Sequence, residues 1–142
     1  MDPQTQKTII TSREEAADFT TGGHLNLAEE NYRYVVDTVQ QHEGTKATYA
    51  DRYNLSSVLV MQHKYAEAEP TLRDMLKYLA KRPVDNDSGH FLKQEEGTIR
   101  MLVKSVKGQG RDEEADNLRA GAAYSSREEQ LEVRKQVYGL DI

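Results

Sequence analysis

Residues 53–69 read YNLSSVLVMQHKYAEAE, and this stretch decides the fold. Apolar residues recur every three or four positions up to Met61, which is the periodicity of a helix with one buried face. The polar run Gln62-His63-Lys64 interrupts them, and a second helical pattern then opens around the small residue Ala68. The stretch therefore predicts a helix, a three-residue turn and a second helix.

Residues 101–116 read MLVKSVKGQGRDEEAD and repeat this pattern in a weaker form. Ala115 is again a small residue near the start of a second helix, and Gly110 supplies the unrestricted backbone that a tight turn needs. Helix–turn–helix units repeated at about 40–47 residues are typical of an α-solenoid, a class of protein that mostly binds other proteins. His63 stands where Gly110 does, so we expect a different turn in the middle unit.

Helical periodicity extends through most of the chain. Ser12 followed by Glu15 fits a capping box, so we expect the first helix to start at Ser12 and to end at residues 20–23. The further helices are expected over residues 25–42, 47–62, 66–81, 91–107 and 112–124. Residues 125–138 form either a separate last helix or a continuation of the one before.

This reading divides the chain into a flexible segment, residues 1–11, and one helical repeat domain, residues 12–142. The repeat units are expected over residues 12–43, 44–83 and 90–139.

Composition limits the classes of function. The 142 residues carry a net charge of -5, which argues against binding to nucleic acid. There is no Cys, so disulfides and thiolate metal sites are excluded. No apolar run approaches the ~18 residues that span a bilayer, and the N-terminus lacks a signal-peptide pattern. We therefore expect a soluble, cytoplasmic protein without a membrane partner.

Several of these motifs together resemble the tetratricopeptide repeat (TPR) family, in its kinesin-light-chain form. Asn54-Leu55, Leu59, residues 62–69 and Leu72 carry the resemblance most strongly. Residues 12–43 and 90–139 restate it more faintly, through Gly23, Ala28 and Tyr32 and through Gly110, Glu114 and Ala115. The resemblance implies an all-α, right-handed α-solenoid of about three TPR-like helix pairs with a C-terminal helical extension. A generic antiparallel helical bundle is the alternative.

In TPR domains the first helix of each pair lines a concave groove that holds a peptide. Carried over by register, the resemblance implies that the partner-binding residues are Tyr53, Asn54, Ser57, Met61, Arg100, Lys104 and Lys107. The carboxylate clamp of chaperone-tail binders is matched by Asn54, and Arg13 could replace its Lys. Ala17 stands where the clamp has Asn, so the clamp pattern is incomplete.

A basic stripe runs along the helix expected at residues 91–107. Arg100, Lys104, Lys107 and Arg111 recur at helical spacing, and no acid lies between Thr98 and Arg111. The stripe predicts contact with an acidic or carboxylate-terminated protein segment. The alternative is an ordinary solvated face.

Residues capable of chemistry do not cluster in the sequence. The four His residues fall at expected turns or helix ends, without a second ligand at metal spacing. Paired acids near helix starts are explained by the helix dipole. We therefore expect no catalytic residue, no metal and no cofactor.

Three functions follow from the sequence. The first is a non-catalytic adaptor that binds a peptide or a partner protein in its groove. The second is a homodimer formed through apolar residues near the C-terminus, namely Leu131, Val133, Val137 and Leu140. The third is an enzyme or small-molecule binder that uses the groove as a pocket.

Overall fold

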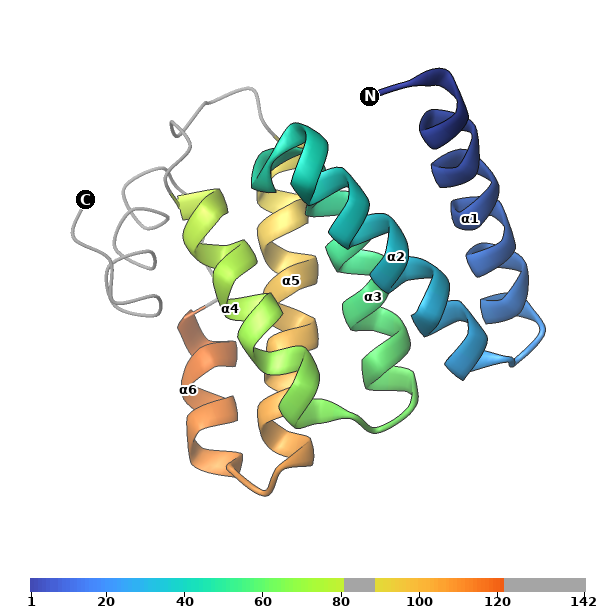
Figure 1. The fold of residues 1–142 in the computed structure, drawn as a ribbon. Helices are drawn as coiled ribbons and strands as arrows, with labels where there is room; N and C mark the ends of the chain where they lie inside the picture. Colours follow the sequence, from blue (N-terminus) through green and yellow to red (C-terminus); the bar gives the residue numbers. More distant parts are fainter. Residues whose placement is uncertain (81–88, 122–142) are drawn as a thin grey trace. The chain divides into compact units, whose positions relative to one another are not determined.

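The computed structural model describes residues 1–80 and 89–121. The chain separates into two compact units, Met1–His63 and Lys64–Ile142, which are described one at a time. Within the described residues the regular structure is entirely helical, as expected for an all-α chain (Figure 1).

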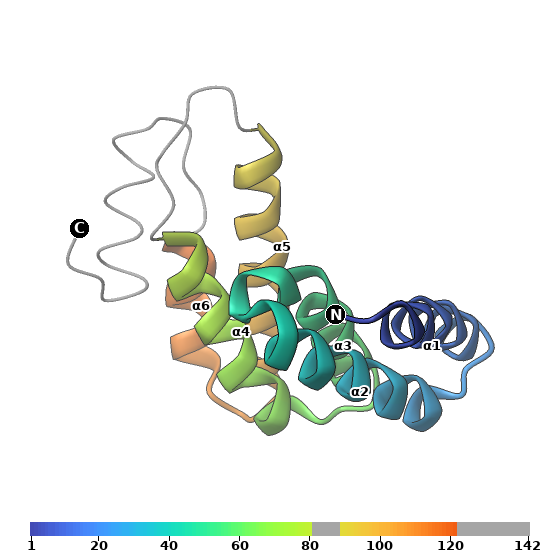
Figure 2. The same cartoon turned by 45° about the horizontal axis from the view of Figure 1, so that its top comes forward.

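The first unit contains three α-helices and one short 3-10 helix: α1 (Pro3–Thr21), α2 (Leu25–Glu43), η1 (Thr45–Thr48) and α3 (Tyr49–Met61). The central helix, α2, packs against both α1 and α3; in Figure 2, α1 is seen beside α2 and α3 behind it. Its buried face carries Ala28, Tyr32, Val35, Val36 and Val39 at the three-to-four-residue spacing of an amphipathic helix.

The first helix starts earlier than expected. It begins at Pro3 rather than at Ser12, so residues 3–11 are helical and are not a flexible segment. The Asp2 carboxylate accepts a hydrogen bond from the backbone N–H of Thr5 at 2.8 Å and caps the helix. Pro3 fits the first turn, where its missing N–H costs no intrahelical hydrogen bond. Ile9 then anchors the segment by packing in a cluster with residues of α2.

The second unit contains α4 (Tyr65–Ala80), α5 (Gly89–Gly108) and α6 (Asp112–Gly121). Here α5 is the central helix and packs against both α4 and α6. The core is formed by apolar residues of all three helices: Ala68, Leu72, Met75, Leu76, Leu79, Ile99, Leu102, Val103, Val106, Ala115 and Leu118. The last helix expected at residues 125–138 lies outside the described residues.

One turn geometry recurs at three places in the described chain. Gly23, His63 and Gly110 all have a left-handed backbone, with φ of 81°, 61° and 82°. Each donates its N–H to the carbonyl of the residue three positions earlier, at 3.2, 3.0 and 2.9 Å. The expectation of a different turn at His63 was therefore wrong, because His63 adopts the conformation that the two glycines adopt.

A fully buried alanine follows each of these turns. Ala28, Ala68 and Ala115 each lie five positions after the left-handed residue and have no exposed surface. A side chain without atoms beyond Cβ lets neighbouring helices approach closely. Ala68 and Ala115, which the sequence pattern marked as small residues near the start of a second helix, are thus both fully buried.

Candidate interaction surface

Two stripes divide the surface of α5, as the sequence pattern predicted. Ile99, Leu102, Val103 and Val106 are buried, whereas Arg100, Lys104 and Lys107 are exposed. A helix with 3.6 residues per turn separates such residues onto two faces.

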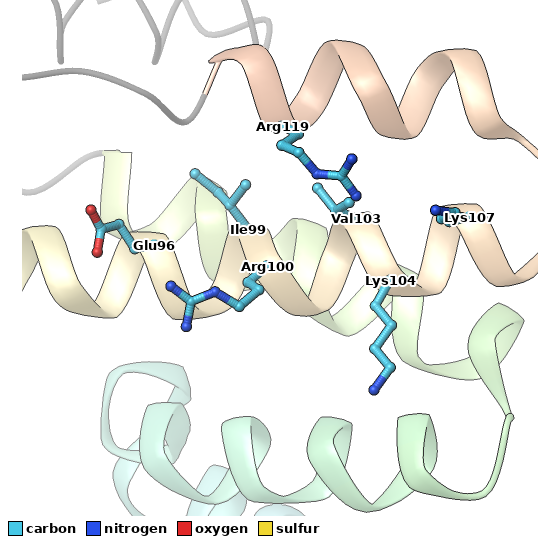
Figure 3. A pocket seen from close by; sticks show the side chains of 7 residues that line it. All are labelled: Glu96, Ile99, Arg100, Val103, Lys104, Lys107 and Arg119. Carbon is cyan, nitrogen blue, oxygen red and sulfur yellow. The ribbon is translucent and has the colours of Figure 1, made fainter.

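The basic stripe borders a hollow of about 530 Å³ between α5 and α6. In Figure 3, Ile99 and Val103 lie on the side of α5 that faces α6, and the Arg119 side chain of α6 extends toward Val103. The hollow is lined by Glu96, Ile99, Arg100, Val103, Lys104, Lys107 and Arg119. Ile99 and Val103 are almost fully buried, so among the described lining residues the charged side chains provide most of the accessible surface.

The charge of this rim is opposite to that of the whole chain. Of the described lining residues, four are cationic and one, Glu96, is anionic, in a protein of net charge -5. Among the described residues, Arg100, Lys104 and Lys107 form no ion pair. Arg119 has only a 3.6 Å contact with Asp116, and both of these side chains are more than half exposed. Among the described residues, the charges that line the hollow are therefore mainly positive and mostly without an anionic partner.

Arg111 belongs to a different cluster, contrary to the four-residue stripe expected from the sequence. Its guanidinium lies 2.7 Å from a carboxylate oxygen of Glu69 on α4 and 2.7 Å from one of Glu114 on α6. Arg73 contacts both of these carboxylates as well, at 2.9 and 2.8 Å. The hydrogen bond from Arg111, helped by those from Gln109 and Arg73, lowers the pKa of Glu69 to about 2 against the opposing effect of burial. Arg111 is thus engaged within the fold and does not line the hollow.

Arg119 is the site residue that the sequence analysis missed. It lies outside the basic run, on the helix that follows α5. Nothing in the sequence around it indicated that its side chain would lie beside those of α5. One signal could have found it. Arg119 lies nine positions after Gly110, and Leu72 lies nine positions after His63. The repeat pattern thus has an apolar residue at this position in one unit and a cation in the next, which indicates that the position is exposed in the latter.

The residues expected on the other half of the groove lie on α3, in the first unit. Asn54 and Met61 are exposed, whereas Tyr53 and Ser57 are half-buried. The structure thus brings Arg100, Lys104 and Lys107 together in one hollow of the second unit, and it places the four α3 residues on a helix of the first. Among the described residues, the Asn54 side chain makes no hydrogen bond.

Arg13 cannot serve as the clamp cation without breaking an existing ion pair. Its Nε and Nη2 donate to the two carboxylate oxygens of Asp51 at 2.9 and 2.8 Å. The Asp51 side chain is only 4% exposed, whereas that of Arg13 is 43% exposed. This bidentate pair joins α1 to α3 and raises the pKa of Arg13, chiefly through the hydrogen bond to Asp51.

The described part of the chain contains no group of three or more His, Cys, Asp or Glu that could hold a metal ion. None of its helices has the length and apolar character needed to cross a membrane. The apolar residues expected to form a homodimer, Leu131, Val133, Val137 and Leu140, lie outside the described residues.

The sequence and the structure were compared with known proteins, and neither comparison found a relative. No family model matches the sequence, and no match was found among curated proteins or solved structures.

Proposed function

We propose that this chain is a non-catalytic protein-interaction module, a TPR-like α-solenoid of about three helix pairs that binds an acidic segment of a partner protein. The observation that carries the proposal is the basic hollow between α5 and α6. Four of the described residues that line it are cationic, and three of these form no ion pair among the described residues.

The recurrent turn supports the repeat architecture. Gly23 and His63 are 40 positions apart and His63 and Gly110 are 47 apart, which is the spacing of helical repeats. The same left-handed turn and the same buried alanine occur at each step. A repeat of this kind exposes one helix of each pair along a continuous surface, which suits it to binding an extended protein segment.

Charge supports the choice of an acidic ligand. Uncompensated cations attract anionic segments over a distance set by salt, and they raise the rate of association more than the affinity. The ligand that this charge favours is a protein segment rich in carboxylates.

The proposal is tested with a charge-reversed triple variant, Arg100→Glu, Lys104→Glu and Lys107→Glu. A matched control reverses three other exposed lysines, Lys7→Glu, Lys46→Glu and Lys77→Glu, on α1, η1 and α4. Both variants have the same net charge, so only the position of the charges differs. The probe is a short fluorescein-labelled peptide rich in Glu with a central Leu, and its binding is measured by fluorescence anisotropy.

We expect the first variant to bind the peptide at least about tenfold more weakly than the native protein, a change of about 1.4 kcal/mol. The control should lose much less, because a diffuse change in net charge acts only through long-range attraction. Equal losses in the two variants, with helical content retained in circular dichroism, would contradict a site in this hollow. No binding by the native protein at low salt would contradict an acidic ligand altogether.

A further inference from the structure

An exposed stripe of residues runs along the whole of α1. Positions that alternate by four and three residues lie on one side of an α-helix, and two helices pair along such a stripe in a coiled coil. The six residues of this stripe are all exposed: Pro3, Lys7, Ile10, Glu14, Ala17 and Thr21. Ile9 and Ala16, the two buried residues of the helix, lie on its other side. The stripe is therefore a face of α1 that packing against α2 leaves uncovered.

Ile10, in the middle of the stripe, offers apolar surface to solvent. Its exposed fraction is 54%, the largest for a large hydrophobic residue in the described part of the chain, whereas the adjacent Ile9 is 4% exposed. Ile10 also lines a hollow of about 240 Å³ together with Met1, which is 38% exposed. Removal of this apolar surface from water favours association with a second surface.

Opposite charges flank Ile10 on the same stripe. Lys7 lies three positions before it and Glu14 lies four positions after it. Both charged side chains are exposed, and neither forms an ion pair among the described residues. The sequence explains this, because no acid lies three or four positions from Lys7 and no base lies three or four positions from Glu14. The stripe thus has an exposed cation on one side of its isoleucine and an exposed anion on the other.

This order of charges is complementary to itself in one orientation. When two copies of α1 lie antiparallel with both Ile10 side chains near the two-fold axis, Lys7 of each copy faces Glu14 of the other. A parallel pair would place like charges opposite one another, which repel. Asp18 favours the antiparallel pair as well, because it lies in the last turn of α1, where a carboxylate opposes the helix dipole. Antiparallel pairing brings this carboxylate toward the N-terminus of the second helix.

We propose that α1 pairs antiparallel with α1 of a second copy of this chain, through Ile10 and through two ion pairs between Lys7 and Glu14. This homodimer goes beyond the proposed function, since the described residues that line the basic hollow belong to α5 and α6. Its interface is also separate from the C-terminal residues for which the sequence predicted a homodimer.

The size of α1 sets the strength of this dimer. A helix of 19 residues is about 28 Å long and about 10 Å wide. Two such helices bury less surface than the ~1,600 Å² of a standard interface. The association is therefore weak and reversible, with a Kd of about 1 μM to 1 mM.

Sedimentation velocity of the full-length protein over this concentration range tests the proposal. We expect the mean mass of the native protein to rise with concentration toward that of a dimer. Lys7→Glu and Glu14→Lys each place like charges opposite one another twice in the dimer, so each should raise the Kd at least about fivefold. The matched controls Lys46→Glu on η1 and Glu30→Lys on α2 change the net charge equally at other exposed positions and should have little effect.

Two recoveries of affinity test the pairing itself. The double variant Lys7→Glu, Glu14→Lys exchanges the two charges and should regain most of the native affinity. An equimolar mixture of the two single variants should also associate, because one chain then has two acids on its stripe and the other has two bases. Recovery of the double variant requires antiparallel pairing, since a parallel pair would still place like charges together.

Ile10→Ala tests the apolar contact at the two-fold axis. Alanine is a good helix former and the position is exposed, so the fold should be retained, which circular dichroism checks. We expect the Kd to rise at least about fivefold. A native protein that stays monomeric up to about 1 mM would overturn the dimer. A dimer with an unchanged Kd in Ile10→Ala and in both single charge variants would place the interface elsewhere and overturn the pairing through α1.

Discussion

The side-chain amide of Gln109 donates a hydrogen bond of 2.8 Å to the Glu69 carboxylate. The same contact occurs in the first unit, where Gln62 donates to Glu29 at 2.9 Å. In both cases the glutamine precedes a left-handed turn residue and the glutamate follows a fully buried alanine. Two equivalent contacts at equivalent positions indicate that the same packing between successive helices is used twice.

Loss of the Glu69 charge should destabilise the second unit. Glu69→Gln removes charge-assisted hydrogen bonds to Arg111 and Arg73 from a side chain that is 13% exposed. We expect the free energy of unfolding to fall by about 1–3 kcal/mol, measured by urea denaturation. Asp116→Asn, at a side chain that is 73% exposed, is the control and should change stability little.

The same variant should change the response to acid. Because the pKa of folded Glu69 is about 2, against an ordinary 4.5, its ionised form stabilises the native state above pH 4.5. This contribution is lost as the pH falls from about 4.5 to about 2, where Glu69 becomes protonated in the folded protein too. The stability difference between native protein and Glu69→Gln should therefore shrink over this interval. A difference that stays constant would show that the carboxylate charge is not its source.

Gly108→Ala should destabilise the contact between α4 and α5. A Cβ added at Gly108 would overlap the aromatic ring of Tyr65, lying 2.7 Å from its Cγ. Overpacking of this kind costs about 1–3 kcal/mol, more than the helix propensity gained by replacing Gly with Ala. Thermal unfolding of Gly108→Ala and of the double variant with Tyr65→Ala distinguishes the cause. If the added Cβ costs as much in the Tyr65→Ala background, then the clash is not responsible.

Substitutions at two left-handed turn residues, Gly110 and His63, should change the free energy of unfolding by clearly different amounts. Gly110→Ala places a side chain at φ 82°, where no atom lies within 4 Å of the new Cβ, so only backbone strain of about 1–2 kcal/mol acts. His63→Gly releases the strain at φ 61° and should cost far less than Gly110→Ala, or stabilise the protein. Urea denaturation of both variants measures this contrast. Similar destabilisation by the two substitutions would mean that the imidazole of His63 matters more than its backbone conformation.

Replacing Arg13 should destabilise the protein more than replacing its ion-pair partner Asp51. Arg13→Met leaves the Asp51 carboxylate, which is only 4% exposed, without its cation and should cost about 3–5 kcal/mol. Asp51→Ala leaves an arginine that is 43% exposed and can be hydrated, so it should cost less. Chemical denaturation of the two single variants gives the order. The reverse order would indicate that Asp51 contributes mainly through contacts other than the ion pair.

Much of the helical structure could be predicted from local pattern. The helix expected at residues 25–42 is α2 (Leu25–Glu43), and the stripe of Ile99, Leu102, Val103 and Val106 is buried on α5. The start of α1 could not be predicted in this way, because few side chains in α1 bury apolar surface. Of its 19 residues only Ile9 and Ala16 are buried, so the periodic signal is weak. The helix forms there because Asp2 caps it and Ile9 packs on α2.

By itself, the sequence determined which of the described residues form helices, apart from residues 3–11, where the turns fall and which face of α5 is basic. These features depend on neighbours a few positions apart, whose effect is encoded in hydrophobic periodicity and in the special backbone of Gly23 and Gly110. Only the tertiary structure decided which cations are free to bind. Arg111 lies in the basic run but is neutralised by Glu69, 42 positions away, whereas Arg119 lies outside the run and joins the hollow. Ion pairing depends on distances between helices, and those distances are set by packing rather than by sequence spacing.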